Sequence, residues 1–511
     1  MDALADSLKV IADWITQHIT MWALIATGLF LTVVTRGVQV RHLPTMIRQV
    51  ASSRSGAAGG ISSFQAFAIS LAARVGVGNV FGVAAALLYG GPGAVFWMWV
   101  VALVGMATAF FEATLAQIFK VRAPDGSFRG GPAFYMARGM GGAGGRVMAG
   151  VFAVITLVTC GFIITSVQSN AVAGTLVAAL GGGEGSALPG FGGLSAAQLV
   201  VAGLVLVLTA VVVFGGIRAV ARVTEWMAPI MALIYIVLVA VVCLLNLGDF
   251  WRVIGRIISS AFAPEPLVGG LGGGVLAAVI NGTKRGLFSN EAGQGTAPNA
   301  AATATVAHPV QQGLIQSLGV FVDTIVVCTA TAFVILIAGP DTWTAPGANP
   351  STLTTLAIAH GLGGWTVLPM AVLIFVLAYS SIIAAYVYTD VNMDYLTGGR
   401  RWASWTVRVV SVASATAGAV LSLDVVWNAV DIAMAVMTLT NLVALIRLHR
   451  WGAGALRDYE DQLRAGAAEP VFRGRDNPRL PGDVPGGVWS SSDDADVTAA
   501  DDGSAPVPPA A

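Results

Sequence analysis

The chain has 511 residues, of which 56% are apolar and 11% are charged, and its 27 basic side chains balance its 27 acidic ones. A soluble globular protein carries about 25% charged residues, so the composition excludes a soluble multidomain protein and indicates a membrane protein. The neutral balance, without a basic patch interleaved with aromatic residues, also excludes nucleic-acid binding.

Eleven apolar segments separated by short polar breaks predict one polytopic bundle. Because no backbone amide can stay unpaired in hydrocarbon, and the alternation of barrel strands is absent, these segments must be helices. We therefore expect an all-α integral membrane protein with eleven transmembrane helices. The expected spans are 19–37, 64–88, 93–119, 148–178, 197–215, 224–247, 268–303, 310–338, 364–388, 403–422 and 426–447.

Basic residues occur mainly in alternate breaks between these spans. By the positive-inside rule those breaks face the cytoplasm, which places the N-terminus outside and the C-terminus inside. The break 248–266 is an exception to this alternation, since it would lie outside and yet carries Arg252 and Arg256. A preference for arginine over lysine, with abundant Ala and Gly, is typical of a GC-rich bacterial genome, so we expect a multi-pass protein in the lipid of a bacterial inner membrane.

The composition changes from about residue 451 to Pro, Gly, Ser, Asp and Arg. Such a segment cannot bury a core. We therefore expect a transmembrane domain over 1–450 and a disordered cytoplasmic tail over 451–511, with a passive solubilising role favoured over a regulatory one.

Two spans are unsuited to be plain membrane helices. The second contains Gly76 and Gly78, one residue apart, and the seventh contains the polar stretch 281–295. Backbone that leaves the helix at membrane depth persists only where protein buries it or where it lines a wet cavity, and the half-helix ends bind ions. We therefore expect both interruptions to face one central site.

The interrupted spans lie five positions apart in the order of spans. Two five-helix repeats of inverted topology, preceded by one extra helix, produce this spacing. The expected extra helix is 19–37, the first repeat is 64–247 and the second repeat is 268–447.

The residues leave alternatives open at these features. A Gly-x-Gly pair in a membrane helix is often only a packing contact, and the stretch 281–295 could be a cytoplasmic loop because Lys284 and Arg285 are costly at the midplane. Ser380 and Ser381, within the ninth span, either return their hydroxyls to carbonyls one turn back or complete an oxygen cage for a monovalent cation. Spacing alone favours the first reading of the serines.

Other polar groups and motifs narrow the class of function. Glu112, Gln168, Asn170 and Asp323 lie within spans and serve function or interhelical contacts. The five histidines form no metal-binding motif, and the nucleophile turn and phosphate loop of known enzymes and ATPases are absent. We therefore expect no enzyme, and any transport must draw on an ion gradient.

The segment 90–105, GGPGAVFWMWVVALVG, closely resembles the signature of the sodium:alanine symporter family, the alanine or glycine:cation symporters. The resemblance extends to RVGVGNVFG at 74–82 and KRGLFSNEAG at 284–293, and covers roughly residues 20 to 450. It implies a LeuT-like fold of ten core helices with one helix in front. It also implies sodium-coupled uptake of a small neutral amino acid such as alanine or glycine, with no organic cofactor.

The resemblance also implies the residues of the site. The amides of Val77 and Gly78 would hold the substrate carboxylate. The substrate would further be faced by Asn79, Gln168, Asn281 and Gly282. The sodium cage would consist of the carbonyls of Ala72, Val75 and Leu377 and the hydroxyls of Ser380 and Ser381, which reverses the preference that spacing alone gives for the serines.

Two departures from the family pattern concern the size of the pocket. Val77 stands where many members have Thr or Ser, and Ala384-Ala385-Tyr386 stands where members often have Gly and an aromatic residue. The pocket could therefore accept a larger substrate such as glutamine. Two rivals remain, a proton-coupled transporter that uses Glu112 or Glu291 and a passive channel, and two broken spans that face one closed site speak against the channel.

Overall fold

The computed structural model describes residues 2–52, 61–123, 126–179, 194–263, 274–345, 348–421 and 424–489. Apart from one two-stranded hairpin, the regular elements in these ranges are helices. The expected all-α architecture is therefore confirmed for this part of the chain.

Each expected span in the first half of the chain contains a helix. The elements are α1 (Asp2–Ile15), α2 (Met21–Val34), α3 (Val38–Arg41), α4 (Leu43–Ser52), α5 (Ser63–Arg74), α6 (Val83–Gly90), α7 (Gly93–Ile118), β1 (Val121–Arg122), β2 (Phe128–Arg129), α8 (Pro132–Tyr135), α9 (Gly142–Val158), α10 (Thr165–Ala179), α11 (Ala196–Val213), α12 (Gly216–Leu245) and α13 (Leu247–Ala261). Strands β1 and β2 pair antiparallel. Wider π-helical turns occupy Thr16–Thr20, Gly78–Gly82, Met136–Met140 and Thr159–Ile164.

The second half is likewise helical. Its elements are α14 (Gly274–Asn290), α15 (Ala297–Ala301), α16 (Pro309–Val320), α17 (Thr329–Ile337), α18 (Pro340–Trp343), α19 (Pro350–Leu362), α20 (Val367–Thr397), α21 (Arg401–Val420) and α22 (Asp424–Arg464). A π-helical turn, Phe321–Cys328, joins α16 to α17, and short 3-10 turns occupy Gly364–Thr366 and Gly487–Trp489.

Within the described ranges, eight helices are long and apolar enough to cross a membrane, or nine if α5 and the bent continuation Gly78–Gly90 count as one span. These nine match nine of the eleven expected spans. The other two expected spans hold α14 and α21, which are helical, although α14 has 17 residues and α21 contains several serines, threonines and arginines. The total of eleven spans stays a prediction.

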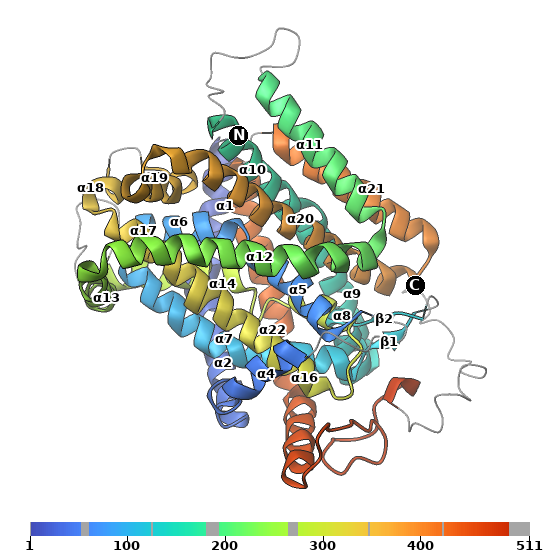
Figure 1. Ribbon diagram of the computed structural model, residues 1–511. Coiled ribbons are helices and arrows are strands. Elements are labelled where there is room, and N and C mark those ends of the chain that lie inside the picture. Colours follow the sequence, from blue (N-terminus) through green and yellow to red (C-terminus); the bar gives the residue numbers. More distant parts are fainter. Residues whose placement is uncertain are drawn as a thin grey trace.

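Helix α7 is the central element of the bundle. It packs against α14, α16 and α2. Small residues permit this approach: a Cβ on Gly105 of α7 would lie 2.9 Å from the Cβ of Ala292. Figure 1 shows α12 crossing the face of the bundle and α11 beside α21 along one edge.

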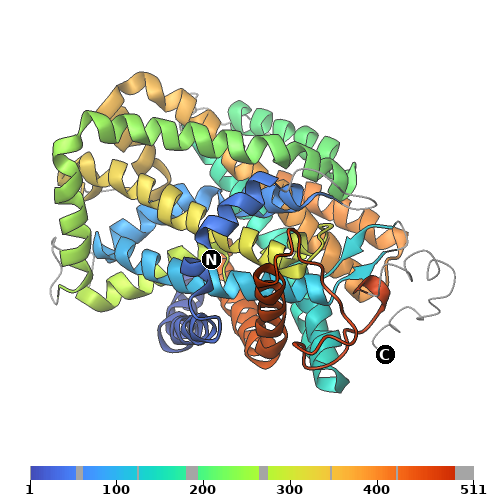
Figure 2. The ribbon, with the colours of Figure 1, turned by 60° about the horizontal axis from the view of Figure 1, so that its bottom comes forward.

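The end of the chain is more ordered than its composition predicts. Helix α22 continues to Arg464, and residues 465–489, the C-terminal segment, fold back against the bundle (Figure 2). The backbone N–H of Phe472 donates to the carbonyl of Ala307, and the indole Nε1 of Trp489 donates to the carbonyl of Gln117 at 3.0 Å. The prediction of disorder is therefore wrong for residues 451–489, while residues 490–511 lie outside the described ranges.

Trp489 covers a buried ammonium group. Lys120 is 2% exposed, and its Nζ donates to the carbonyl of Ala304 at 3.0 Å. The same Nζ lies 4.1 Å from the ring centroid of Phe128 and 4.7 Å from that of Trp489, so cation–π attraction supplements one hydrogen bond. A few aromatic anchors thus order a segment whose average composition is polar.

Replacing Trp489 should release the C-terminal segment. Truncation of a buried tryptophan to alanine costs about 3 kcal/mol, so in Trp489→Ala we expect hydrogen exchange across residues 465–489 to accelerate by roughly 100-fold. Hydrogen-exchange mass spectrometry of the detergent-solubilised protein measures this. Trp365→Ala, at a side chain that is 72% exposed, is the matched control, and equal exchange in both variants would contradict the anchoring role.

His308 makes this junction sensitive to pH. It begins α16, where its Nδ1 accepts the N–H of Val310, and its Nε2 lies 3.1 Å from Oδ2 of Asp458. Burial lowers the pKa of His308 below its usual value, although the hydrogen bond to Asp458 opposes this. As the pH falls below about 6.5, His308 of the unfolded chain therefore binds a proton, while His308 of the folded chain stays neutral. The contribution of His308 to the free energy of unfolding is fully present above about pH 6.5 and is lost as the pH falls below it.

We expect the melting temperature of the purified protein to fall between about pH 7.5 and 5.5, and to fall less in His308→Asn. Asparagine retains a side-chain oxygen that caps a helix without titrating. A fall of the same size in both proteins would show that another group is responsible.

Candidate functional site

The first interruption lies between α5 and α6, where the glycine pair predicts it. Helix α5 ends at Arg74, Val75 leaves the helical region with φ −78° and ψ 79°, and the two helical parts are bent by 46°. A Cβ on Gly76 would lie 2.3 Å from Oγ of Ser381, so only glycine fits there. The predicted interruption is confirmed. Gly76 also permits a close packing contact with α20, which was the alternative interpretation of the glycine pair.

The second interruption begins later than the sequence predicts. Helix α14 continues to Asn290, and the chain reaches α15 through residues 291–296. Within this stretch Glu291, Gly293 and Gly295 have φ values of 55°, 88° and 86°. Glycine adopts this left-handed region freely, whereas Glu291 is strained there. The left-handed residues, and not the polar stretch as a whole, end the helix.

Asn281 and Gly282 are therefore corrected as candidates, because they lie within regular helix and do not line the central cavity. Nδ2 of Asn281 donates to the carbonyl of Ala277 one turn back at 2.9 Å. A Cβ on Gly282 would lie 2.5 Å from the carbonyl oxygen of Ala94, so this glycine permits close packing of α14 on α7. The expectation of unwound backbone at these two residues does not hold.

The two basic residues of this stretch are compensated within the bundle. Nζ of Lys284 lies 2.5 Å from Oδ1 of Asp13 on α1 and 3.2 Å from Oδ2 of Asp431 on α22, and Nη2 of Arg285 lies 3.7 Å from the same oxygen of Asp431. The stretch up to Asn290 is a helix and not the loop that we left open, because these carboxylates offset the cost of its charges.

Glu112 of α7 holds the second interruption in place. Its carboxylate accepts the N–H of Gly293 at 3.1 Å and that of Gly295 at 2.8 Å, and it accepts Nδ2 of Asn441 on α22 at 2.6 Å. The hydroxyl of Tyr135 donates to the other end of the Asn441 amide. The carboxylate thus supplies acceptors for backbone donors that the broken helix leaves free.

Asn79 connects the two interruptions. Its Oδ1 accepts the N–H of Gly76 at 2.9 Å, and its Nδ2 donates to Oδ1 of Asp323 at 2.6 Å and to Oγ of Ser289 at 2.9 Å. Ser289, on the last turn of α14, donates to Oδ2 of Asp323 at 2.8 Å. This buried network gives a direct physical link between the backbone of the first interruption and the helix that leads into the second.

Ser380 and Ser381 of α20 face the last turn of α5. Both hydroxyls lie 3.0 Å from the carbonyl oxygen of Ala72; that of Ser381 lies 3.1 Å from the carbonyl of Ala73, and that of Ser380 lies 2.7 Å from the carbonyl of Leu377. All of these are oxygen atoms, the ligands that hard cations prefer. Nowhere in the described ranges do three or more His, Cys, Asp or Glu side chains form a metal-holding group.

The other residues predicted to bind substrate or sodium fall into two groups, those that line the central cavity and those that do not. The N–H of Val77 donates to Oε1 of Gln168 at 3.3 Å, and both Gly78 and Gln168 line the cavity. The side chain of Asn79 is engaged in the network above. Val75 is fully buried, and no hydrogen bond among the described residues joins it to the serines.

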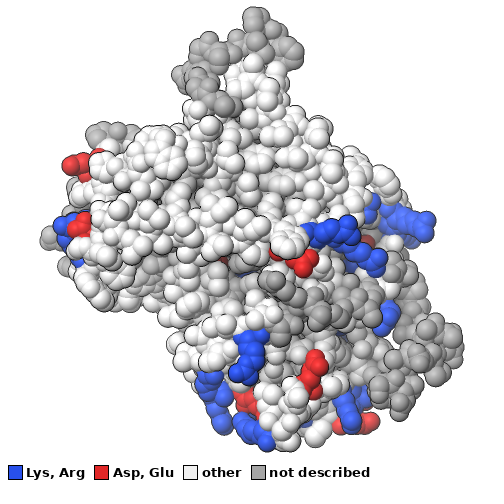
Figure 3. Space-filling view, viewed as in Figure 1, with Lys and Arg blue, Asp and Glu red and all other residues white. Residues whose placement is uncertain are grey.

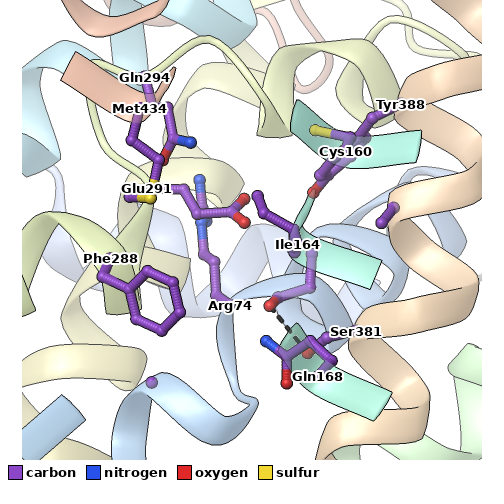
Figure 4. A pocket seen from close by; sticks show the side chains of 13 residues that line it. Arg74, Cys160, Ile164, Gln168, Phe288, Glu291, Gln294, Ser381, Tyr388 and Met434 are labelled. Carbon is purple, nitrogen blue, oxygen red and sulfur yellow. Dashed lines mark hydrogen bonds between the residues drawn. The ribbon is translucent and has the colours of Figure 1, made fainter. Parts of the chain in front are cut away.

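A central cavity lies between the two interruptions. Its volume is about 10 Å³, room for about one water molecule, so an amino acid requires the walls to move. Figure 4 shows the side chains of Arg74 and Glu291 in its centre, with Gln168 and Ser381 beside each other below them. The lining residues are Ala73, Arg74, Gly78, Cys160, Ile164, Gln168, Phe288, Glu291, Gln294, Ser381, Ala385, Tyr388 and Met434.

Arg74 and Gln294 present unpaired polar atoms in this cavity. Nη1 of Arg74 donates to the carbonyl of Gln316 at 3.1 Å, but its Nε and Nη2, and both amide atoms of Gln294, have no hydrogen-bond partner among the described residues. The two side chains are 1% and 0% exposed. An unpaired buried polar group costs roughly 1–3 kcal/mol, so such groups point to a polar ligand.

Sequence analysis did not select either residue as a ligand. The available signal was an ionisable side chain inside a span for Arg74, and a position next to two flexible glycines for Gln294. Neither signal shows that the two side chains meet in one cavity.

Comparisons with known proteins agree with these features. A family model described as the sodium:alanine symporter family matches residues 1–474. The amino-acid carrier protein AlsT of Bacillus subtilis is 40% identical over 94% of this chain and 97% of its own length. The probable sodium/glutamine symporter GlnT of the same organism is 38% identical over 90% and 91%, and the sodium/alanine symporter AgcS of Methanococcus maripaludis is 36% identical over 83% and 90%.

A solved structure of a manganese transporter from Eremococcus coleocola aligns with 77% of this chain and 75% of its own at 15% identity and a TM-score of 0.43. That likeness is too weak to establish a shared fold. The family match over almost the whole chain and the relatives near 40% identity are decisive. The chain belongs to the sodium:alanine symporter family.

Proposed function

We propose that this protein is a secondary active transporter that couples the entry of sodium to the uptake of a small neutral amino acid. The observation that carries the proposal is the cavity between two broken helices, which holds Arg74, Glu291 and Gln294 next to the oxygen cluster of Ser380 and Ser381. A buried cation and a buried carboxyl group in one cavity complement the two charges of an amino-acid zwitterion.

The substrate carboxylate would lie at the amides of Val77 and Gly78, on the side of Arg74, and its ammonium group would lie toward Glu291. Gln168 already accepts the N–H of Val77, so its amide would exchange this bond when the carboxylate arrives. Asn79 would position the amides without touching the substrate, since its side chain is bonded to Gly76, Ser289 and Asp323.

Sodium would bind among the carbonyls of Ala72, Val75 and Leu377 and the hydroxyls of Ser380 and Ser381. The hydroxyl hydrogens that now point to carbonyls would turn away and leave oxygen lone pairs for the ion. Because Ala72 and Val75 flank the end of α5, the ion would order the first interruption and thereby the amides that hold the carboxylate. Coupling requires only that sodium bind the outward-open state more tightly than the inward-open one.

The overall organisation that we propose has eleven spans in a LeuT-like arrangement, with two inverted repeats of five. The beginning of α1 and the C-terminal segment lie toward opposite ends of the bundle in Figure 1, which supports termini on opposite sides of the membrane. The positive-inside rule then assigns the N-terminus to the outside and the C-terminus to the cytoplasm of a bacterial cell. Alanine and glycine are the proposed substrates. Glutamine is the larger alternative, because Ala385 lines the cavity and one relative is named a probable sodium/glutamine symporter.

A proton-coupled transporter of the same fold is the second candidate. It is favoured by Glu291, a carboxyl group that lines the cavity, and one relative from Bacillus subtilis, 39% identical, is named a putative sodium/proton-dependent alanine carrier. Glu112 is less suited to carry protons, because two backbone amides and Asn441 occupy its carboxylate. A passive channel is less supported by a cavity that holds about one water molecule.

Uptake into proteoliposomes tests the coupling ion. Under an inward sodium gradient we expect labelled alanine to accumulate, and at a potential of about 100 mV one sodium ion per substrate supports roughly 50-fold accumulation. Glycine and glutamine as competitors would define the pocket. Uptake that continues when choline replaces sodium, and is abolished in Glu291→Gln, would instead establish proton coupling.

Ser381→Ala tests the sodium cage. Removing one oxygen ligand from a charged group costs about 1.5 kcal/mol, so the half-saturating sodium concentration should rise about tenfold, while alanine affinity at saturating sodium changes little. Ser411→Ala is the matched control, because Ser411 is a buried serine of α21 whose hydroxyl has no partner in the described ranges. Equal losses of sodium and alanine affinity would argue against the cage.

A further inference from the structure

A second cavity, separate from the central one, lies at the end of the bundle that carries the C-terminal segment. It has a volume of about 220 Å³. Figure 3 shows that charged side chains on this face of the molecule gather mainly at its lower end and right-hand edge. The cavity is lined by Val34, Thr35, Arg36, Arg41, Ala453, Leu456, Arg457, Glu460, Asp461, Arg464 and Arg479. Five arginines against two carboxylates leave it with an excess of three positive charges.

The two carboxylates fix three of the arginines. Oε1 of Glu460 accepts Nη2 of Arg41 at 2.8 Å, and Oε2 of Glu460 lies 3.2 Å from Nη2 of Arg464. Asp461 pairs with Arg464 at 2.9 Å and also with Arg479 of the C-terminal segment. These pairs position the guanidinium groups and satisfy the acidic side chains, so the carboxylates are not free to neutralise the rest of the cavity.

Arg36 and Arg457 supply two of the three excess positive charges. Neither side chain forms an ion pair within the ranges that the structure describes. Arg36 also has a φ of 54°, directly after α2, at a position where glycine is usual because other residues are strained there. Gly37, the next residue, has a φ of 72°, so two consecutive left-handed residues turn the chain from α2 into α3 at the cavity that Arg36 lines.

Arginine clusters of this kind match phosphate groups. The planar guanidinium fork donates two parallel hydrogen bonds to phosphate oxygens, and an excess of positive charge in a partly enclosed site favours an anion. The two helices that reach the cavity also expose apolar side chains along their length: Val33 of α2 is 72% exposed and Ile446 of α22 is 44% exposed. A phosphate carried on acyl chains would therefore find an apolar surface next to the basic one.

We propose that this cavity binds a phosphate group and that the bound phosphate fastens the C-terminal segment to the bundle. The phosphate would accept hydrogen bonds from Arg36 and Arg457. It would also accept one from Arg479 and thereby hold the C-terminal segment close to α2. Two sources share this chemistry, the headgroup of an anionic lipid in the facing leaflet and a soluble phosphate compound, and the probes below distinguish them. This site lies outside the transport cavity and does not depend on which ion or amino acid is carried.

Native mass spectrometry of the delipidated full-length protein tests the proposal with three probes. Dioleoyl-phosphatidylglycerol carries a phosphate on acyl chains, pyrophosphate carries it in solution, and dioleoylglycerol carries the same chains without phosphate. We expect at least one phosphate probe to bind and dioleoylglycerol to bind no tighter than background. Binding of the lipid alone assigns the headgroup as the source, and binding of pyrophosphate assigns a soluble compound.

The variant R36A/R457A should weaken binding of the active probe at least tenfold, whereas R400A/R401A, which removes the same charge from residues outside the cavity, should not. In the wild type the active probe should also slow hydrogen exchange across residues 465–489 by at least tenfold. Arg479→Ala, on an exposed part of the C-terminal segment, replaces the double variant if that variant does not fold. Absence of binding by every phosphate probe, or equal binding in R36A/R457A and wild type, would overturn the proposal.

Discussion

The structure depends on one constraint: at membrane depth, every backbone group that a broken helix frees must find a partner inside the protein. Glu112 meets this constraint at the second interruption by accepting the amides of Gly293 and Gly295. Asn79 meets it at the first by accepting the amide of Gly76. Because these side chains supply the partners, the chain can leave the helix twice and still expose polar atoms to a small central cavity.

The same side chains bring distant parts of the chain into one network. Glu112 comes from α7 and is steadied by Asn441 of α22, while Asn79 reaches Asp323 between α16 and α17. A change at the oxygen cluster of α20 would act on the end of α5, and from there on the backbone that Asn79 holds. The geometry therefore offers a short physical route between the oxygen cluster and the groups that face the cavity, without a separate relay.

The end of the bundle that bears the C-terminal segment follows a different principle. Lys120 is buried but bonded to a carbonyl and covered by the rings of Phe128 and Trp489, so a few aromatic contacts outweigh the polar average of the segment. The arginines of the second cavity, by contrast, are only partly neutralised. The side of the segment at Trp489 is thus packed against the bundle. The side at Arg479 contributes to a positively charged cavity that an external anion can neutralise.

The sequence by itself determined the membrane class, the helical nature of the spans, the family and the interruption at Gly76 and Gly78, because long apolar runs and paired glycines act locally. For Ser380 and Ser381, spacing and the family resemblance favoured opposite readings. The sequence misplaced Asn281 and Gly282, and it missed the order of residues 451–489. Only the tertiary structure decided where the second helix breaks, which carboxylate seals that break, and that Arg74 and Gln294 share a cavity. Each of these depends on partners from helices far apart in the chain, and spacing along one helix does not specify such partners.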